Sequence, residues 1–193
     1  MIADLIAANR SCRRFDENHP VDLSTLEHLV ELARLSASGA NLQPLKYILS
    51  CRPDYNAEIF SCLGWAAYLK DWPGPQPGER PAAYIVILGD RKISKDFGVD
   101  HGIAAQSILL GARDKGLAGC MLGSINRKVL RTVLDIPAHL TILLVLAIGK
   151  PTEEVVIETV GKDGNIQYWR DEQAVHHVPK RPLAEIIIVS HAA

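Results

Sequence analysis

Two apolar runs constrain the fold of this 193-residue chain more than any other feature. They are Ala82–Gly89 and Thr141–Gly149, each rich in β-branched residues and bounded by turn signals. Such runs are typical of strands buried on both faces of a sheet. Between them, the pattern predicts a helix over Asp100–Lys115 that is apolar on nearly every side. Because such a surface must be covered, we expect this helix at the centre of the molecule or at a subunit interface.

Shorter elements surround this centre. A short helix is expected near the start, around Ile2–Ile6, and a second over Leu23–Leu35, capped by Asp22 or Ser24. Further predictions are a strand over Leu45–Ser50, a helix over Tyr55–Leu69, and strands over Val155–Val160 and Ile166–Trp169, joined as a hairpin by the GKDGN turn. Helices and strands mix without a strict βαβ rhythm, so we expect one α+β domain over residues 1–193.

Charge and cysteine content exclude several classes of function. Lys+Arg (21) and Asp+Glu (22) nearly cancel, so no basic surplus favours nucleic acid or an anionic membrane. The four cysteines have no CxxC spacing, and the longest apolar run, Ile142–Ile148, is too short to cross a bilayer. We therefore expect a cytoplasmic protein that binds neither nucleic acid nor membrane.

Motifs for a self-sufficient active site are missing from the sequence. There is no G-x-G-x-x-G after a predicted strand, no Walker loop, no G-x-S-x-G elbow and no H-E-x-x-H. No metal site is expected, and no side chain is singled out as catalytic. If this protein performs chemistry, we expect a bound cofactor to supply it.

Three polar segments carry the candidate site. RSCRRF (Arg10–Phe15) offers guanidiniums and a hydroxyl that suit a phosphate, and SASGANLQP (Ser36–Pro44) offers amides that suit the edge of a heteroaromatic ring. VPKRPL (Val178–Leu183) adds a second basic turn. Taken singly, each segment is equally compatible with solvated surface charge or ordinary turn formation.

In this order the segments resemble the nitroreductase family. That family has an R-S-x-R turn near the start, a P-S-x-x-N-x-Q-P-type turn 25 to 30 residues later, and a K/R-R-x-P-L near the end. DHGIAAQSILLGARDKGLAGCMLG (Asp100–Gly123) resembles its central helix and the strand entering the flavin site, and LLVLAIGKPTEE (Leu143–Glu154) resembles a later strand and turn. The chain departs from the pattern at Asn9, Ala37 and Leu45, which weakens any transfer of substrate preference.

The resemblance implies a three-layer fold, with a mainly antiparallel central sheet flanked by helices, in an intertwined homodimer that binds FMN between its subunits. Arg10, Ser11 and Arg13 would hold the phosphate and ribityl chain. Ser38, Asn41 and Gln43 would line the ring or the substrate space. The backbone of Met121, Leu122 and Gly123 would approach the ring, and Lys180 or Arg181 would close on the phosphate.

The implied activity is an FMN-dependent oxidoreductase. It would take hydride from NAD(P)H, a transient donor, and reduce a small planar acceptor such as a nitroaromatic or quinone by a ping-pong mechanism. Three alternatives stay open: a flavin carrier or sensor without turnover, a family branch with dehalogenating or flavin-fragmenting chemistry, and a protein with no flavin. The segment Trp65–Pro81 is either an active-site lid or ordinary packing.

Overall fold

The computed structural model describes residues 1–191, which form two compact units. The first unit comprises residues 1–65 and 74–152, and the second comprises residues 66–73 and the chain from 153 onward. The expectation of a single domain over the whole chain stays a prediction. No helix in residues 1–191 is both long and apolar enough to span a membrane.

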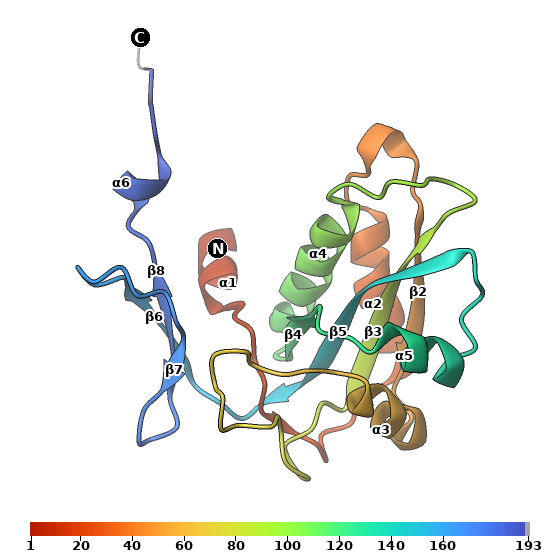
Figure 1. The fold of residues 1–193 in the computed structure, drawn as a ribbon, viewed down its shortest axis with the longest axis horizontal. Coiled ribbons are helices and arrows are strands. Elements are labelled where there is room, and N and C mark those ends of the chain that lie inside the picture. The colour runs from red at the N-terminus through yellow and green to blue at the C-terminus, as the bar shows by residue number, and fades with distance from the viewer. Residues whose placement is uncertain (192–193) are drawn as a thin grey trace. The chain divides into compact units, whose positions relative to one another are not determined.

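The first unit is a sheet between two layers of helices (Figure 1). Its elements are α1 (Ile2–Ala8), β1 (Phe15–Asp16), α2 (Leu23–Arg34), η1 (Gly39–Asn41), β2 (Leu45–Ser50), α3 (Pro53–Ser61), β3 (Ala83–Asp90), α4 (Asp100–Asp114), β4 (Ala118–Leu122), α5 (Arg127–Val133) and β5 (Leu140–Pro151). The strand order is β1-β5-β3-β2, with β4 also paired to β5, and every pairing is antiparallel. The α+β class and the antiparallel sheet are confirmed.

The side chains of β3 point alternately to the two faces of the sheet, and this explains the three layers. Ile85 and Ile87 pack with α2 and α4 on one face of the sheet. Tyr84, Val86 and Leu88 point to the other face, where α3 and α5 lie. A strand covered on both faces needs apolar residues at successive positions, which is the pattern that predicted β3 and β5.

The structure settles the cap of α2 and corrects the end of α3. Asp22 is the cap of α2, because its side chain accepts a hydrogen bond from the Thr25 amide. The helix predicted over Tyr55–Leu69 is wrong beyond Ser61. There the backbone turns to pair with residues 124–126: the Gly64 amide donates to the Ser124 carbonyl, and Leu63 bridges Ile125. A tertiary pairing thus replaces helical hydrogen bonds that the apolar pattern alone allowed.

The second unit contains a small sheet of different topology. Its elements are β6 (Val155–Thr159), β7 (Trp169–Arg170), β8 (His176–Lys180) and α6 (Leu183–Ile186). The GKDGN turn is present, since the Gly164 amide donates to the Gly161 carbonyl, but the predicted hairpin is wrong. β6 pairs in parallel with β8, and β7 pairs antiparallel with the other edge of β8. β8 therefore lies between the two strands that were expected to pair with each other.

Candidate functional site

The RSCRR segment is fixed to β4 by its backbone. Ser11 forms a parallel bridge with Gly119, and the Cys12 amide donates to the Gly119 carbonyl at 2.9 Å. The Cys12 side chain is buried, whereas Ser11 is exposed and Arg13 half-buried. The structure therefore brings the first predicted segment beside the strand that carries Met121–Gly123.

Gly119 lets β4 pack closely against β5 and α4 at this position. A Cβ at this position would lie 2.6 Å from both the Ala147 carbonyl oxygen and Leu109 Cδ2. No side chain fits at such a distance, so only glycine lets β4 pass between α4 and β5 here. The sequence analysis did not single out this residue, because a lone glycine in an apolar run gives no specific signal.

The arginines of this segment differ in their partners. Arg14 pairs with Glu79 at 3.4 Å, so its charge is matched. Arg10 donates from Nη2 to the Ile6 carbonyl, and its buried Nε has no hydrogen-bond partner. Within residues 1–191 Arg10 forms no ion pair. A half-buried guanidinium without a carboxylate suits an anionic ligand.

The backbone at the end of β4 is accessible to a ligand. Met121 is 37% exposed and Leu122 is buried in the core. A Cβ added at Gly123 would meet nothing within 4 Å, so open space lies against this backbone. Leu122 can thus contribute only its backbone to a ligand, whereas Met121 and Gly123 can be reached directly.

The second predicted segment forms a strained turn. Ala40, Asn41 and Gln43 have φ values of 47°, 54° and 52°, in the left-handed region that non-glycine residues rarely adopt. Such conformations cost about 1–3 kcal/mol each and persist only where the surroundings impose them. Asn41 and Gln43 are both exposed. The turn therefore presents two amide side chains on a backbone held away from its relaxed state.

Asp100 holds this turn in place. Its Oδ2 accepts from Ser38 Oγ at 2.6 Å, and its Oδ1 accepts from the Gly39 amide at 2.9 Å. Ser38 Oγ in turn accepts from the Gln43 amide at 2.9 Å. Asp100 is only 7% exposed and is the first residue of α4, where a negative charge is favourable. The sequence analysis gave Asp100 no role in positioning the turn.

A cavity of about 430 Å³ opens beside the turn, lined by Ser38, Gln43, Tyr47 and Asp100 among others. Burial, assisted by the negative charge of Asp100, raises the pKa of Tyr47 to about 12. Tyr47 therefore carries a neutral phenol at physiological pH, which can donate a hydrogen bond.

One chain does not bring all the predicted residues together. The Ser38–Gln43 turn is anchored at the first residue of α4, whereas Arg10–Arg13 lies beside the start of β4, which follows the last turn of α4. Figure 1 shows the orange turn between α2 and β2 near one end of α4 and β4 near the other. The 15 residues of α4 span about 22 Å. Two partial sites therefore lie at opposite ends of one helix.

The remaining predicted residues belong to the second unit. Lys180 ends β8 and is exposed. Arg181 is also exposed and pairs with Glu185 at 3.4 Å. In the same unit Tyr68 packs on Tyr168 with ring centroids 4.9 Å apart, and Trp72 lies under the Arg170 guanidinium at 4.3 Å. These contacts agree with the packing interpretation of this part of Trp65–Pro81.

Two other observations concern metal-binding and cysteine side chains. Within residues 1–191, no three His, Cys, Asp or Glu side chains are grouped to hold a metal ion. None of the four cysteines, all of which lie in the described part of the chain, forms a disulfide, and Cys120, next to the exposed end of β4, is 1% exposed. A buried thiol in an apolar environment is usually unreactive.

Comparison with known proteins identifies what this arrangement resembles. The model of the nitroreductase family matches residues 6–150. A putative NAD(P)H nitroreductase of Bacillus subtilis (strain 168), YodC, is 22% identical, with 76% of this chain and 88% of that protein covered. A nitroreductase family protein from Clostridium novyi NT shares the fold with a TM-score of 0.67 and 21% identity, over 79% of this chain and 86% of that one. An FMN-dependent nitroreductase from Clostridium difficile R20291 has a TM-score of 0.64 and 24% identity, over 80% of this chain and 89% of that one.

Proposed function

The chain belongs to the nitroreductase family, and we propose that it is an FMN-dependent oxidoreductase that uses NAD(P)H to reduce a small planar acceptor. The observation that carries the proposal is the Arg10–Arg13 segment pinned beside the start of β4, the strand whose other end leads to the exposed Met121 and Gly123. The Arg10 guanidinium is half-buried without a carboxylate partner, and open space lies against the backbone at Gly123, which suits a ligand with a phosphate and a flat ring. The FMN-dependent nitroreductase of Clostridium difficile supports the choice of flavin.

The residues have distinct roles in this proposal. Arg10, Ser11 and Arg13 bind the phosphate and ribityl chain, and Lys180 or Arg181 adds a further cation. The backbone of Met121, Leu122 and Gly123 would contact the ring. FMN, when bound, would supply the two-electron chemistry for a ping-pong cycle between a nicotinamide donor and an acceptor. The protein fixes the ring, donates hydrogen bonds from its backbone and limits the access of water.

We include a homodimer in the proposal because each chain carries two separated partial sites. A two-fold axis beside the outer face of α4 would place the Ser38–Gln43 turn of one copy near Arg10–Arg13 of the other. That face is available, since Val99 is 72% exposed and Gly102 meets nothing within 4 Å. The whole chain then acts as one FMN-binding domain within the dimer.

The C-terminal segment also supports association. Within Leu183–Val189, Leu183 is 69% exposed, Ile188 89% and Val189 64%. Consecutive large apolar side chains at such exposure form a patch that a second chain would cover. We also propose a cytoplasmic location, because the four cysteines, all within the described residues, form no disulfide.

The first experiment is the absorbance spectrum of the purified protein, with the released flavin identified after denaturation. We expect about one FMN per subunit. Arg13→Ala should lose most of this flavin, whereas Arg52→Ala, an exposed arginine paired with Asp54, should keep it. A colourless protein that also fails to take up added FMN would refute the cofactor assignment.

Turnover is tested on the flavin-loaded protein. Anaerobic addition of NADH or NADPH should bleach the flavin, and a nitroaromatic or quinone should restore its colour. Flavin that is bound but never reduced would instead identify a carrier or sensor. Reduction without transfer to either acceptor would favour the dehalogenating or flavin-fragmenting branches.

The dimer has its own test. Gly102→Arg adds a side chain into space that is open within the chain, so the protomer should fold normally. We expect light scattering to show a monomer with reduced FMN content. The control is Val129→Arg, at a 44% exposed position on α5 on the opposite face of the sheet. A Gly102→Arg protein that remains dimeric and fully loaded with flavin would contradict the proposed interface.

A further inference from the structure

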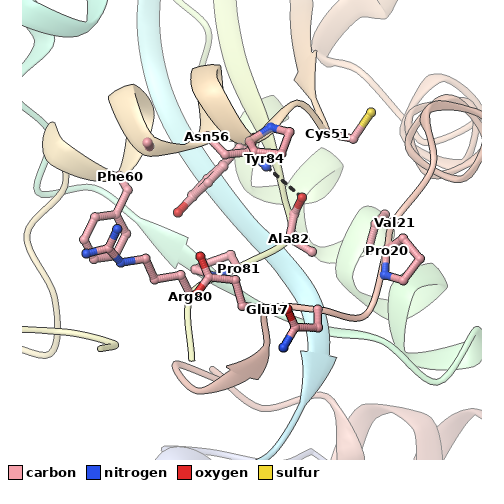
Figure 2. Close-up of a pocket in the computed structure, with 13 residues that line it drawn as sticks. Glu17, Pro20, Val21, Cys51, Asn56, Phe60, Arg80, Pro81, Ala82 and Tyr84 are labelled. Carbon is pink, nitrogen blue, oxygen red and sulfur yellow. Dashed lines mark hydrogen bonds between the residues drawn. The ribbon is translucent and has the colours of Figure 1, made fainter. Parts of the chain in front are cut away.

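A second pocket lies on the α3 side of the first unit, away from the face of the sheet that packs on α4. It has a volume of about 250 Å³ and is lined from the loop before α2, from α3 and from the start of β3. Figure 2 shows Arg80 and Phe60 on one side of this pocket and Pro20 and Val21 on the other. None of these residues has a role in the function proposed above.

The pocket contains a buried hydroxyl without a partner. Tyr84 is 1% exposed, and its hydroxyl forms no hydrogen bond within the described chain. A buried polar group left unpaired costs about 1–3 kcal/mol, so each one in a native protein calls for an explanation. Burial raises the pKa of Tyr84, which keeps the phenol protonated and able to donate. In Figure 2 this hydroxyl points toward the side of the pocket where Arg80 lies.

Arg80 supplies a positive charge at the same side. Its guanidinium lies over the Phe60 ring, 4.4 Å from the centroid, and its buried Nε is unpaired. Within residues 1–191 it makes no ion pair with a carboxylate. Stacking on an aromatic ring orients the planar guanidinium while leaving its edge free to donate. The one acidic residue lining the pocket, Glu17, is exposed and its Oε2 accepts the Gly78 amide.

The walls of the pocket are rigid. Asn56 Nδ2 donates to the Ala82 carbonyl at 2.7 Å, drawn as a dashed line in Figure 2, and Asn56 Oδ1 accepts from Ser50 Oγ at 2.7 Å. On the other side, the Phe15 amide donates to the Glu79 carbonyl at 3.0 Å, which fixes the loop leading to Arg80. A preformed cavity loses little entropy when a ligand binds.

We infer that this pocket binds a small carboxylic acid with an apolar body, such as an aromatic monocarboxylate. The carboxylate would accept from the Arg80 guanidinium and the Tyr84 hydroxyl, and the apolar body would contact Pro20, Val21 and Ala57. A volume below the roughly 300–1,000 Å³ of pockets for drug-sized ligands suits a molecule with one ring. The inference does not depend on FMN binding or on turnover.

The test uses 4-fluorobenzoate as the probe, observed by fluorine NMR during titration with the full chain. Arg80→Gln should weaken binding about tenfold or more, because it removes the charged donor. Tyr84→Phe should weaken binding about two- to tenfold, because it removes one neutral hydrogen bond. Melting curves of both variants confirm that they remain folded.

Two controls separate this pocket from other sites. Arg52→Gln removes a guanidinium that also lies over an aromatic ring, that of Tyr55 at 4.9 Å, and should leave probe binding unchanged. Arg13→Ala should also leave binding unchanged, since it alters only the proposed flavin site. No binding to the wild-type chain, equal binding to the Arg80 and Tyr84 variants, or loss of binding in Arg13→Ala alone would each overturn the inference.

Discussion

Replacing Asp100 with alanine tests whether one buried carboxylate holds the Ser38–Gln43 turn. Asp100 accepts hydrogen bonds from Ser38 Oγ and the Gly39 amide. Bonds to a charged group contribute about 1.5–3 kcal/mol each, and burying the carboxylate offsets part of that sum. Once released, the turn can relax its left-handed residues, which limits the loss. We therefore expect Asp100→Ala to lower the free energy of unfolding by about 2–3 kcal/mol.

The assay is urea unfolding of the flavin-free protein, followed by flavin titration. Ser38→Ala should cost about 1–2 kcal/mol, and the double variant should cost less than the sum, with a coupling of about 1 kcal/mol. The control is Asp114→Ala, an exposed acid at the last residue of α4, which should change stability by less than about 0.5 kcal/mol. If Asp100→Ala matches this control, or if the two single changes add exactly, Asp100 does not anchor the turn.

Three further predictions concern other parts of the chain. Gly119→Ala should destabilise the protein by about 1–3 kcal/mol in urea, because its Cβ meets the Ala147 carbonyl and Leu109 at 2.6 Å. Gly123→Ala, with open space around it, should stay within about 0.5 kcal/mol of wild type. The hydrogen bond that His177 donates to the Asp171 carboxylate, with help from Glu158, raises the pKa of His177, so the stability lost in His177→Gln should be largest below about pH 6.5 and shrink as pH rises through the native pKa. Thermal unfolding across pH checks this, and a pH-independent difference would contradict it. Ile188→Asp, at an 89% exposed position, should weaken dimerisation in light scattering without lowering the stability of the protomer.

The local sequence pattern was sufficient to predict those helices and strands whose surroundings are uniform along their length. The strand predicted over Leu45–Ser50 is β2, and the helix predicted over Asp100–Lys115 is α4 with one residue fewer. Both faces of β3 and β5 are covered by helices, so their apolar runs carry a strong signal. The family resemblance then predicted that the sheet is the central layer and that helices flank it.

Elements that depend on distant partners were predicted poorly. The apolar pattern extended α3 to Leu69, but pairing of Leu63 with Ile125 ends the helix at Ser61. The residues of β8 were not predicted as a strand, and part of them was assigned to the basic turn Val178–Leu183, although β8 is the central strand of the second sheet. α5 was not predicted at all. A short or polar segment gains most of its stability from tertiary contacts, which no local window contains.

The candidate site shows the same division. The sequence by itself predicted which residues could bind a ligand: the arginines of RSCRR, the amides of the Asn41 and Gln43 turn, and the backbone of Met121, Leu122 and Gly123. Those are properties of side-chain chemistry and spacing. Only the tertiary structure decided that Asp100 fixes the turn, that Ser11 and Cys12 pair with Gly119 of β4, and that Tyr84 and Arg80 share a pocket. These pairs are brought together by folding, because residues distant in sequence become neighbours only when the sheet and its helices pack.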